Sequence, residues 1–170
     1  GFVWKVVEAK WPGFEDAFEQ FDVGHVAHLS DDGIDDLLKD TRIVRNGQKI
    51  IAVRNNAIFL TELQQEYGSV GKFFADWPAD DLIGLLELLK KRGSRLGGMT
   101  GCYFPRFMGK ESFIISRDVT AALIRMGVVD KAPTSKVALQ KVQAAFNELK
   151  EESGRNMTHI SQVLAMSADG

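Results

Sequence analysis

Residues 88–103 read Leu88-Leu89-Lys90-Lys91-Arg92-Gly93-Ser94-Arg95-Leu96-Gly97-Gly98-Met99-Thr100-Gly101-Cys102-Tyr103. A leucine-rich helical run here joins a second helix through a short, glycine-rich turn. Such a joint leaves backbone N–H groups unpaired at the start of the second helix, where the helix dipole is positive. The cations just upstream favour a nucleic-acid phosphate as the bound anion. The expected contacts are Arg95, Gly97, Gly98, Thr100 and Gly101, although Gly97 and Gly98 would also suit a plain tight turn between packed helices.

Composition limits the kind of protein this chain can be. Its 170 residues are 45% hydrophobic and 26% charged, as in an ordinary globular protein, and suffice for one compact domain or two small lobes. The single cysteine, Cys102, excludes an internal disulfide framework and fits a reducing compartment, so we expect a cytoplasmic protein. No apolar run is long enough to cross a bilayer, and no signal-peptide pattern opens the chain. The net charge of −2 means that DNA binding would need a local basic face.

The hydrophobic spacing predicts an all-α fold. Expected helices include one with Pro12 in its first turn, one opened by Asp31 and Asp32, and the ranges 43–60, 82–89 and 118–126. Further helices are expected from about residue 99, after Pro133, and around residues 160–164. Residues 112–116 read as an extended piece without a partner strand. We predict a single domain over residues 1–170, with a hairpin at about 88–108 and returning helices over 134–168.

Four motifs carry a family resemblance. They are Phe18-Glu19-Gln20-Phe21-Asp22, Arg42-Ile43-Val44-Arg45-Asn46-Gly47-Gln48-Lys49-Ile50 with Asn56-Ala57, Leu89-Lys90-Lys91-Arg92-Gly93, and Gly98-Met99-Thr100-Gly101-Cys102-Tyr103. In order and spacing they resemble DNA-3-methyladenine glycosylase I, of the helix-hairpin-helix DNA glycosylase superfamily, over roughly residues 1–109. From Lys110 onward the chain is more similar to the wider superfamily, in which an extended segment leads into an aspartate at a helix start.

The resemblance implies base-excision repair of double-stranded, damaged DNA. The expected reaction is hydrolysis of the N-glycosidic bond of an alkylated purine such as 3-methyladenine, which leaves an abasic site. A carboxylate beside the sugar would stabilise its developing positive charge and orient a water. The matching residue is Asp118; the alternative is that Asp118 only caps the 118–126 helix. A monomer without redox or nucleotide cofactor is expected.

Departures from the family matter equally. The positions that match the second pair of the family's zinc ligands are Val119 and Leu123, which cannot bind zinc, so we predict no metal. His25 and His28 are far from other soft ligands and read as surface residues. The position matched to the Schiff-base lysine of the lyase members is Cys102, which predicts a monofunctional enzyme.

The resemblance also assigns two aromatic residues near the start of the chain. Trp4 matches a base-pocket tryptophan and Phe2 lies where the family inserts a wedge into the duplex, although both could be core residues. The family's glutamate and further pocket aromatics would precede Gly1, and we expect that residues are missing there. Trp11, Trp77 and the phenylalanines at 14, 18, 21, 73 and 74 are expected in the core. Arg45, Lys49 and Arg54 would track phosphate or, more simply, form a solvated face.

Two other functions stay open at this point. The non-family C-terminal half could reshape the pocket for a different damaged base. Alternatively, the hairpin could belong to a DNA-binding module without catalysis.

Overall fold

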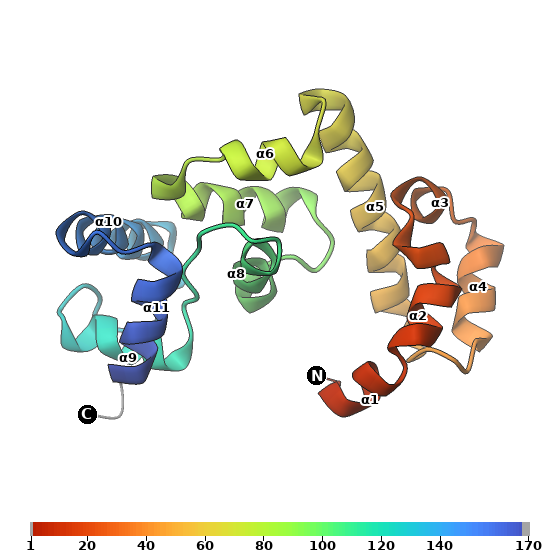
Figure 1. The fold of residues 1–170 in the computed structure, drawn as a ribbon. Helices are drawn as coiled ribbons and strands as arrows, with labels where there is room; N and C mark the ends of the chain where they lie inside the picture. Colours follow the sequence, from red (N-terminus) through yellow and green to blue (C-terminus); the bar gives the residue numbers. More distant parts are fainter. Residues whose placement is uncertain (1, 168–170) are drawn as a thin grey trace. The chain divides into compact units, whose positions relative to one another are not determined.

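The computed structural model describes residues 2–167 and contains only helices as regular elements in that range (Figure 1). The expected all-α fold is therefore confirmed. The chain divides into two compact units, Gly1–Val70 and Gly71–Gly170. The expectation of a single domain stays a prediction. Among the described residues, no helix is long and apolar enough to cross a membrane.

The first unit surrounds a core built on its longest helix. Its elements are α1 (Trp4–Ala9), α2 (Trp11–Ala17), η1 (Glu19–Phe21), α3 (Val23–Ala27), α4 (Asp31–Lys39) and α5 (Gly47–Tyr67). Helix α5 packs against α3 and α4. The buried residues of this core are Phe18, Val26, Ile34, Leu37, Ile43, Ile50 and Ala57. The helical spacing of these apolar residues along α4 and α5 is what turns one face of each helix inward.

The long helix differs from the sequence prediction at both ends, since it spans Gly47–Tyr67 rather than 43–60. The long helix begins at Gly47 rather than Ile43, because the Asn46 side chain accepts the Lys49 N–H at 3.0 Å and caps it. Ile43 is buried although it lies in the preceding loop, so its apolar side chain belongs to the core without being part of the helix. Helix α2 ends at Ala17 because the next turn contains left-handed backbone, with φ near 55° at Gln20 and Phe21.

The second unit carries the hairpin. Its elements are α6 (Val70–Asp76), η2 (Ala79–Asp81), α7 (Leu82–Arg92), α8 (Gly98–Phe107), α9 (Arg117–Arg125), α10 (Lys136–Ser153) and α11 (Met157–Met166). Helix α10 packs on α7 and α11, and α11 packs on α9. The expected return of two C-terminal helices is thus found inside this unit. The short helices α1, α3 and α6 were not predicted from the sequence.

The extended segment 112–116 has no partner strand, as expected. Its backbone donors are satisfied by hydroxyls of α11 instead: the Ser112 N–H donates to Thr158 Oγ1 at 3.1 Å and the Ile114 N–H to Ser161 Oγ at 3.0 Å. Between them, the Phe113 ring stacks on Phe146 at 4.2 Å and is fully buried. The C-terminal helices therefore fix the course of the chain that leads to Asp118.

An ion pair also fixes the start of the segment 112–116, through Glu111, the residue just before it. Glu111 accepts hydrogen bonds from Lys150 Nζ at 2.8 Å and from the Met157 N–H at 2.7 Å, at the start of α11. Burial opposes ionisation of Glu111, but the Lys150 and Met157 hydrogen bonds and the charges of Lys150 and Lys110 outweigh it and lower the pKa. Because the folded pKa lies below the usual 4.5, the pair stabilises the fold above that pH.

We expect Glu111→Gln to lower the free energy of unfolding at neutral pH by about 1–2 kcal/mol, since this charged pair is partly exposed. The difference in free energy of unfolding between the variant and wild type should narrow as the pH falls through the folded pKa of Glu111. Protonation of Glu111 then removes the same stabilisation from wild type. Thermal unfolding followed by circular dichroism across this range measures it. Glu148→Gln, at an exposed carboxylate of α10, is the control. If the difference in free energy of unfolding stays constant down to about pH 2.5, the stabilising role of the Glu111–Lys150 pair is wrong.

Candidate functional site

Two glycines close the hairpin between α7 and α8. A Cβ on Gly93 would lie 2.6 Å from Leu96 Cδ1 and 2.7 Å from the Leu89 carbonyl oxygen. A Cβ on Gly101 would lie 2.5 Å from the Leu96 carbonyl oxygen, and Gly101 is buried. Both positions require glycine because the backbone approaches closely there. Gly101, expected to contact phosphate, therefore serves the packing of the hairpin, and a direct phosphate contact at Gly101 stays a prediction.

Gly98 faces open space instead, whereas a Cβ on Gly97 would lie 3.3 Å from Cγ of Lys90. Gly97 is the N-cap of α8 and has no side chain to accept a hydrogen bond, so the N–H groups of the first turn remain uncapped. Gly98 has φ +59°, and no atom lies within 4 Å of the position that a Cβ would take. Thr100 is exposed in the same turn. We call these uncapped N–H groups at the positive end of the helix the anion cradle, because such groups suit an anion; that an anion binds here stays a prediction.

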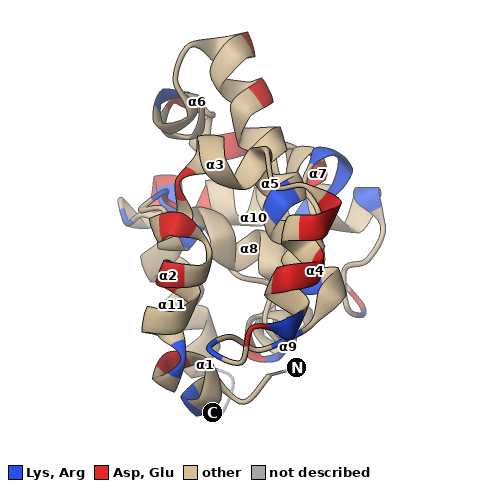
Figure 2. Cartoon of the chain, turned by 90° about the vertical axis from the view of Figure 1, so that its right-hand side faces the viewer, with Lys and Arg blue, Asp and Glu red and all other residues tan. Residues whose placement is uncertain are grey.

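The charge around this cradle is strongly one-sided. Residues 88–110 contain six lysines and arginines and no aspartate or glutamate. Three of these cations, Lys90, Lys91 and Arg92, form the last turn of α7. Residues 71–170 as a whole carry 14 Lys and Arg against 11 Asp and Glu, whereas residues 1–70 carry 7 against 12. Figure 2 shows basic residues on α7 and acidic residues on α4. The hairpin segment is therefore the local concentration of positive charge in the second unit, and its use in DNA binding stays a prediction.

Asp118 lies in the first turn of α9 and is exposed. It is not the cap of that helix: Ser116 is, and its Oγ accepts the Val119 N–H at 3.2 Å. Among the described residues, no hydrogen bond or ion pair engages the Asp118 carboxylate. The alternative that Asp118 only caps the helix is thus wrong, and its carboxylate is available to a ligand.

Contacts join the hairpin helix to the segment that precedes Asp118. Arg106 of α8 donates through Nη2 to the Ser112 carbonyl oxygen at 2.7 Å. The Ile115 N–H donates to the Cys102 sulfur, while burial raises the pKa of that thiol and outweighs this hydrogen bond. Helix α8 therefore packs directly against the segment 112–115 that leads to Asp118.

Cys102 itself faces the core and is 5% exposed. The position matched to a Schiff-base lysine is therefore turned away from solvent. Helix α8 contains no lysine in any of its ten residues, Gly98-Met99-Thr100-Gly101-Cys102-Tyr103-Phe104-Pro105-Arg106-Phe107. An imine-forming amine is thus missing from this helix whichever of its positions is compared.

The residues at the positions matched to zinc ligands, and the two histidines of the first unit, form no metal site in the described structure. Val119 and Leu123 are buried on the inner face of α9. His25 and His28 are exposed, and His28 Nδ1 is 2.7 Å from the Gly24 carbonyl oxygen. Within residues 2–167, no group of three His, Cys, Asp or Glu side chains is placed to hold a metal ion. The lack of a zinc site stays a prediction.

The aromatic residues assigned to the base pocket lie in the first unit. Trp4 is 73% exposed on α1, a helix without buried residues, so it is not a core residue. Phe2 is half-buried, with Lys49 Nζ 3.4 Å from its ring centroid. Their roles as pocket and wedge stay predictions. Trp11, expected in the core, is 47% exposed although its ring stacks on Phe21 at 5.6 Å.

The basic residues of α5 serve partly in structure. Arg54 donates through Nη1 to the Leu29 carbonyl oxygen at 3.1 Å and to Asp31 at 2.9 Å, so it ties α5 to the start of α4. Lys49 covers Phe2, as described above. The sequence left two alternatives for Arg45, Lys49 and Arg54, phosphate binding or a solvated face. Of these, Arg54 makes defined structural contacts within the first unit.

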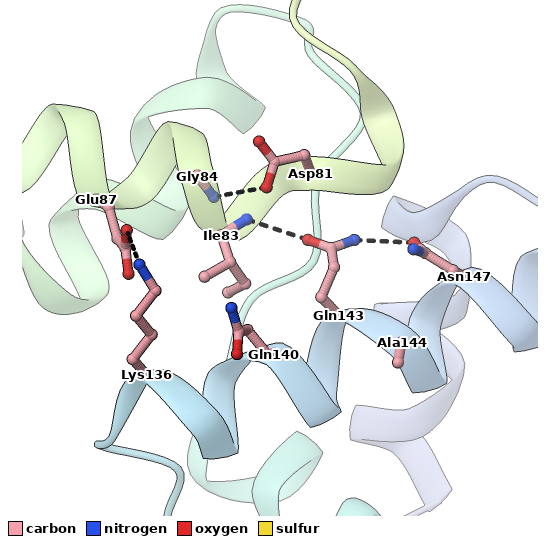
Figure 3. A pocket seen from close by; sticks show the side chains of 9 residues that line it. All are labelled: Asp81, Ile83, Gly84, Glu87, Lys136, Gln140, Gln143, Ala144 and Asn147. Carbon is pink, nitrogen blue, oxygen red and sulfur yellow. Dashed lines mark hydrogen bonds and ion pairs between the residues drawn. The ribbon is translucent and has the colours of Figure 1, made fainter.

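A groove of about 320 Å³ lies between α7 and α10. Several of its polar groups are paired with one another (Figure 3): Gln143 accepts the Ile83 N–H at 3.0 Å and donates to Asn147 at 2.9 Å, while Lys136 lies 3.3 Å from Glu87. None of the sequence-predicted site residues lines it. The groove therefore joins α10 to the first helix of the hairpin and is not the candidate site.

The second unit thus combines a glycine hairpin, an uncapped helix start and an exposed aspartate in the first turn of the next helix, within an all-helical fold. Residues 1–84 match the methyladenine glycosylase family. A crystal structure of 3-methyladenine DNA glycosylase I is similar at 28% identity with a TM-score of 0.50. The chain is thus similar to DNA-3-methyladenine glycosylase I in sequence over residues 1–84 and in fold, and the family resemblance of its motifs is confirmed.

These similarities have a defined extent. The structural match covers 61% of this chain and 66% of the 3-methyladenine glycosylase chain. The family match ends at Gly84, within the first turn of α7. The hairpin and Asp118 both lie beyond it, so their roles rest on the geometry of the second unit.

Proposed function

We propose that this protein is a monofunctional DNA glycosylase of base-excision repair, which hydrolyses the N-glycosidic bond of an alkylated purine such as 3-methyladenine. The match of residues 1–84 to methyladenine glycosylases is the observation that carries this proposal. The uncapped start of α8, with open space at Gly98, and the unpartnered Asp118 support it, because they would supply the two groups that the reaction needs.

In the proposed mechanism, the hairpin holds a backbone phosphate of damaged duplex DNA through the first-turn N–H groups of α8, with Arg95 and the α7 cations adding attraction. The nucleotide must leave the stack, which costs less for a lesion. Alkylation makes the base a good leaving group, so the enzyme mainly stabilises the cationic sugar. The Asp118 carboxylate does so and accepts a proton from the water that attacks the sugar. The products are free base and an abasic site.

Other parts of the proposal follow from the same reasoning. Trp4 would stack on the alkylated base, since an aromatic ring attracts a cationic purine, and Phe2 would enter the duplex. The absence of lysine from α8 supports hydrolysis without strand cleavage. We propose a monomer without a metal or organic cofactor, located in the cytoplasm with its DNA substrate.

The test is direct. Wild-type protein incubated with DNA treated with a methylating agent should release 3-methyladenine, identified by chromatography, and should leave alkali-sensitive abasic sites without strand breaks before alkali treatment. Release of a different base from DNA carrying other lesions would favour the alternative substrate.

If no base is released but the protein binds duplex DNA with a steep salt dependence, the enzyme proposal fails. The DNA-binding module without catalysis then becomes the correct description, because the cradle and its cations would account for that binding alone.

A further inference from the structure

Helix α8 presents an apolar face to solvent that the proposed reaction does not use. Met99, Tyr103 and Phe107 follow one another at four-residue spacing, which places them on one side of the helix. Tyr103 is 41% exposed and Phe107 is 79% exposed. Their rings stack on each other, with centroids 5.9 Å apart and planes inclined by 21°. Among the described residues, no other ring contacts Phe107.

The opposite side of α8 explains why this face stays open. Cys102 and Pro105 are buried, and Phe104 packs against Phe74 of α6 at 5.6 Å. The helix is thus anchored by one side, and the aromatic pair on the other side has no structural partner in its own unit. Aromatic rings held so close to water indicate a binding surface.

The charge of the surrounding segment points to the kind of partner. The face lies within residues 88–110, which contain six cations and no acid. Its first residue, Met99, is in the turn of α8 that forms the phosphate cradle, and Tyr103 follows about one turn later. A partner must therefore offer both anions and flat apolar surfaces at short spacing. DNA with unpaired bases has both, because every base has a face that stacks on aromatic rings.

We propose that Tyr103 and Phe107 form a stacking platform for an unpaired base of DNA whose phosphate is held at Gly97 and Gly98. This rests on the proposed function only in taking DNA as the ligand. Extrusion of a damaged nucleotide leaves bases without their stacking neighbours, and the platform stabilises that distorted state. The contact is with a base face, so it is tolerant of sequence.

Binding of single-stranded oligonucleotides by the full chain tests the proposal. The probes are a fluorescein-labelled thymine strand of about twelve nucleotides and a strand of equal length with abasic residues at its centre. We expect Phe107→Ser and Tyr103→Ser each to weaken binding of the thymine strand about 5- to 150-fold by anisotropy. The abasic strand should bind the variants and wild type equally. The slope of log affinity against log salt should be unchanged, because no phosphate contact is lost.

Matched variants separate stacking from other effects. Tyr103→Phe keeps the ring and should keep the affinity, and Met166→Ser removes an equally exposed apolar side chain from α11 without effect. An equal loss on both probes, or no loss on the thymine strand, overturns the proposal. So does a lowered melting temperature of Phe107→Ser, which would show that the ring is buried in the protein in solution.

Two further outcomes also decide against the platform. Loss of binding to anionic phospholipid vesicles with unchanged oligonucleotide binding would assign the face to a membrane. A change in sedimentation of Phe107→Ser would assign it to a second copy of the chain.

If wild type releases no methylated base yet the ring variants lose base-dependent binding, the proposed glycosylase activity fails and the platform stands.

Discussion

Replacing Asp118 by asparagine is expected to reduce base release from methylated DNA about 10²- to 10⁴-fold, the usual contribution of a positioned acid or base. We expect this loss of activity because Asp118 is the only carboxylate in the first turn of α9. It is exposed to solvent and does not serve as the N-cap, so it is free to act on a substrate. Asparagine keeps the shape but removes the negative charge that stabilises the cationic sugar. Binding of undamaged duplex should change little, because phosphate contacts lie at the hairpin. Single-turnover release of labelled base measures the rate.

The fold should survive this substitution. Asp118 makes no hydrogen bond in the described structure, and loss of its charge near the start of α9 costs about 0.3–1 kcal/mol through the helix dipole. Asp130→Asn, at an exposed carboxylate of the loop after α9, is the matched control and should keep full activity. Full activity of Asp118→Asn would show that another group stabilises the sugar. The catalytic assignment, though not the glycosylase proposal, would then be wrong.

The sequence predicted the helices of the second unit better than the role of each residue in them. The run of leucines located α7 over 82–89, and in the structure the Asp81 carboxylate caps this helix by accepting the Gly84 N–H at 3.1 Å. The hairpin motif likewise located α8. Cap identity at α9 was harder, because Ser116 and Asp118 are both good N-cap residues, and only the backbone conformation shows that Ser116 takes that position.

Exposure was the least predictable property. Tyr103 and Phe107 are visible in the sequence at helical spacing, but so are buried residues of the same helix. Which side is open depends on where α6 packs, through Phe74 and Phe104, and spacing within α8 does not contain that information. Trp11 was assigned to the core for the same reason and is half exposed. Long-range packing thus decides between a core aromatic and a binding surface.

The glycines of the hairpin show the same limit. The sequence grouped Gly97, Gly98 and Gly101 as phosphate contacts, whereas the structure separates them by what surrounds each one. Gly101 lies against the Leu96 carbonyl oxygen, and Gly98 lies against open space with a positive φ. Sequence spacing identifies glycines that are needed but does not distinguish a close backbone approach from an open ligand cradle.

Gly101→Ala is therefore expected to lower both stability and DNA binding. A Cβ 2.5 Å from the Leu96 carbonyl oxygen forces the turn away from α8, which costs about 1–3 kcal/mol, as overpacking does elsewhere. The shift would also misplace the N–H groups of the first turn of α8. Differential scanning calorimetry and duplex binding by anisotropy measure the two effects.

Gly98→Ala provides the contrast, because its added methyl group meets no protein atom. The left-handed backbone costs about 1–2 kcal/mol for alanine, so the fold is retained, but the methyl group enters the space that a phosphate would occupy. Binding should fall by more than the loss of stability explains, and activity should fall with it. If Gly101→Ala instead keeps the melting temperature of wild type and loses only binding, Gly101 contacts the phosphate directly. The packing role assigned to it would then be wrong.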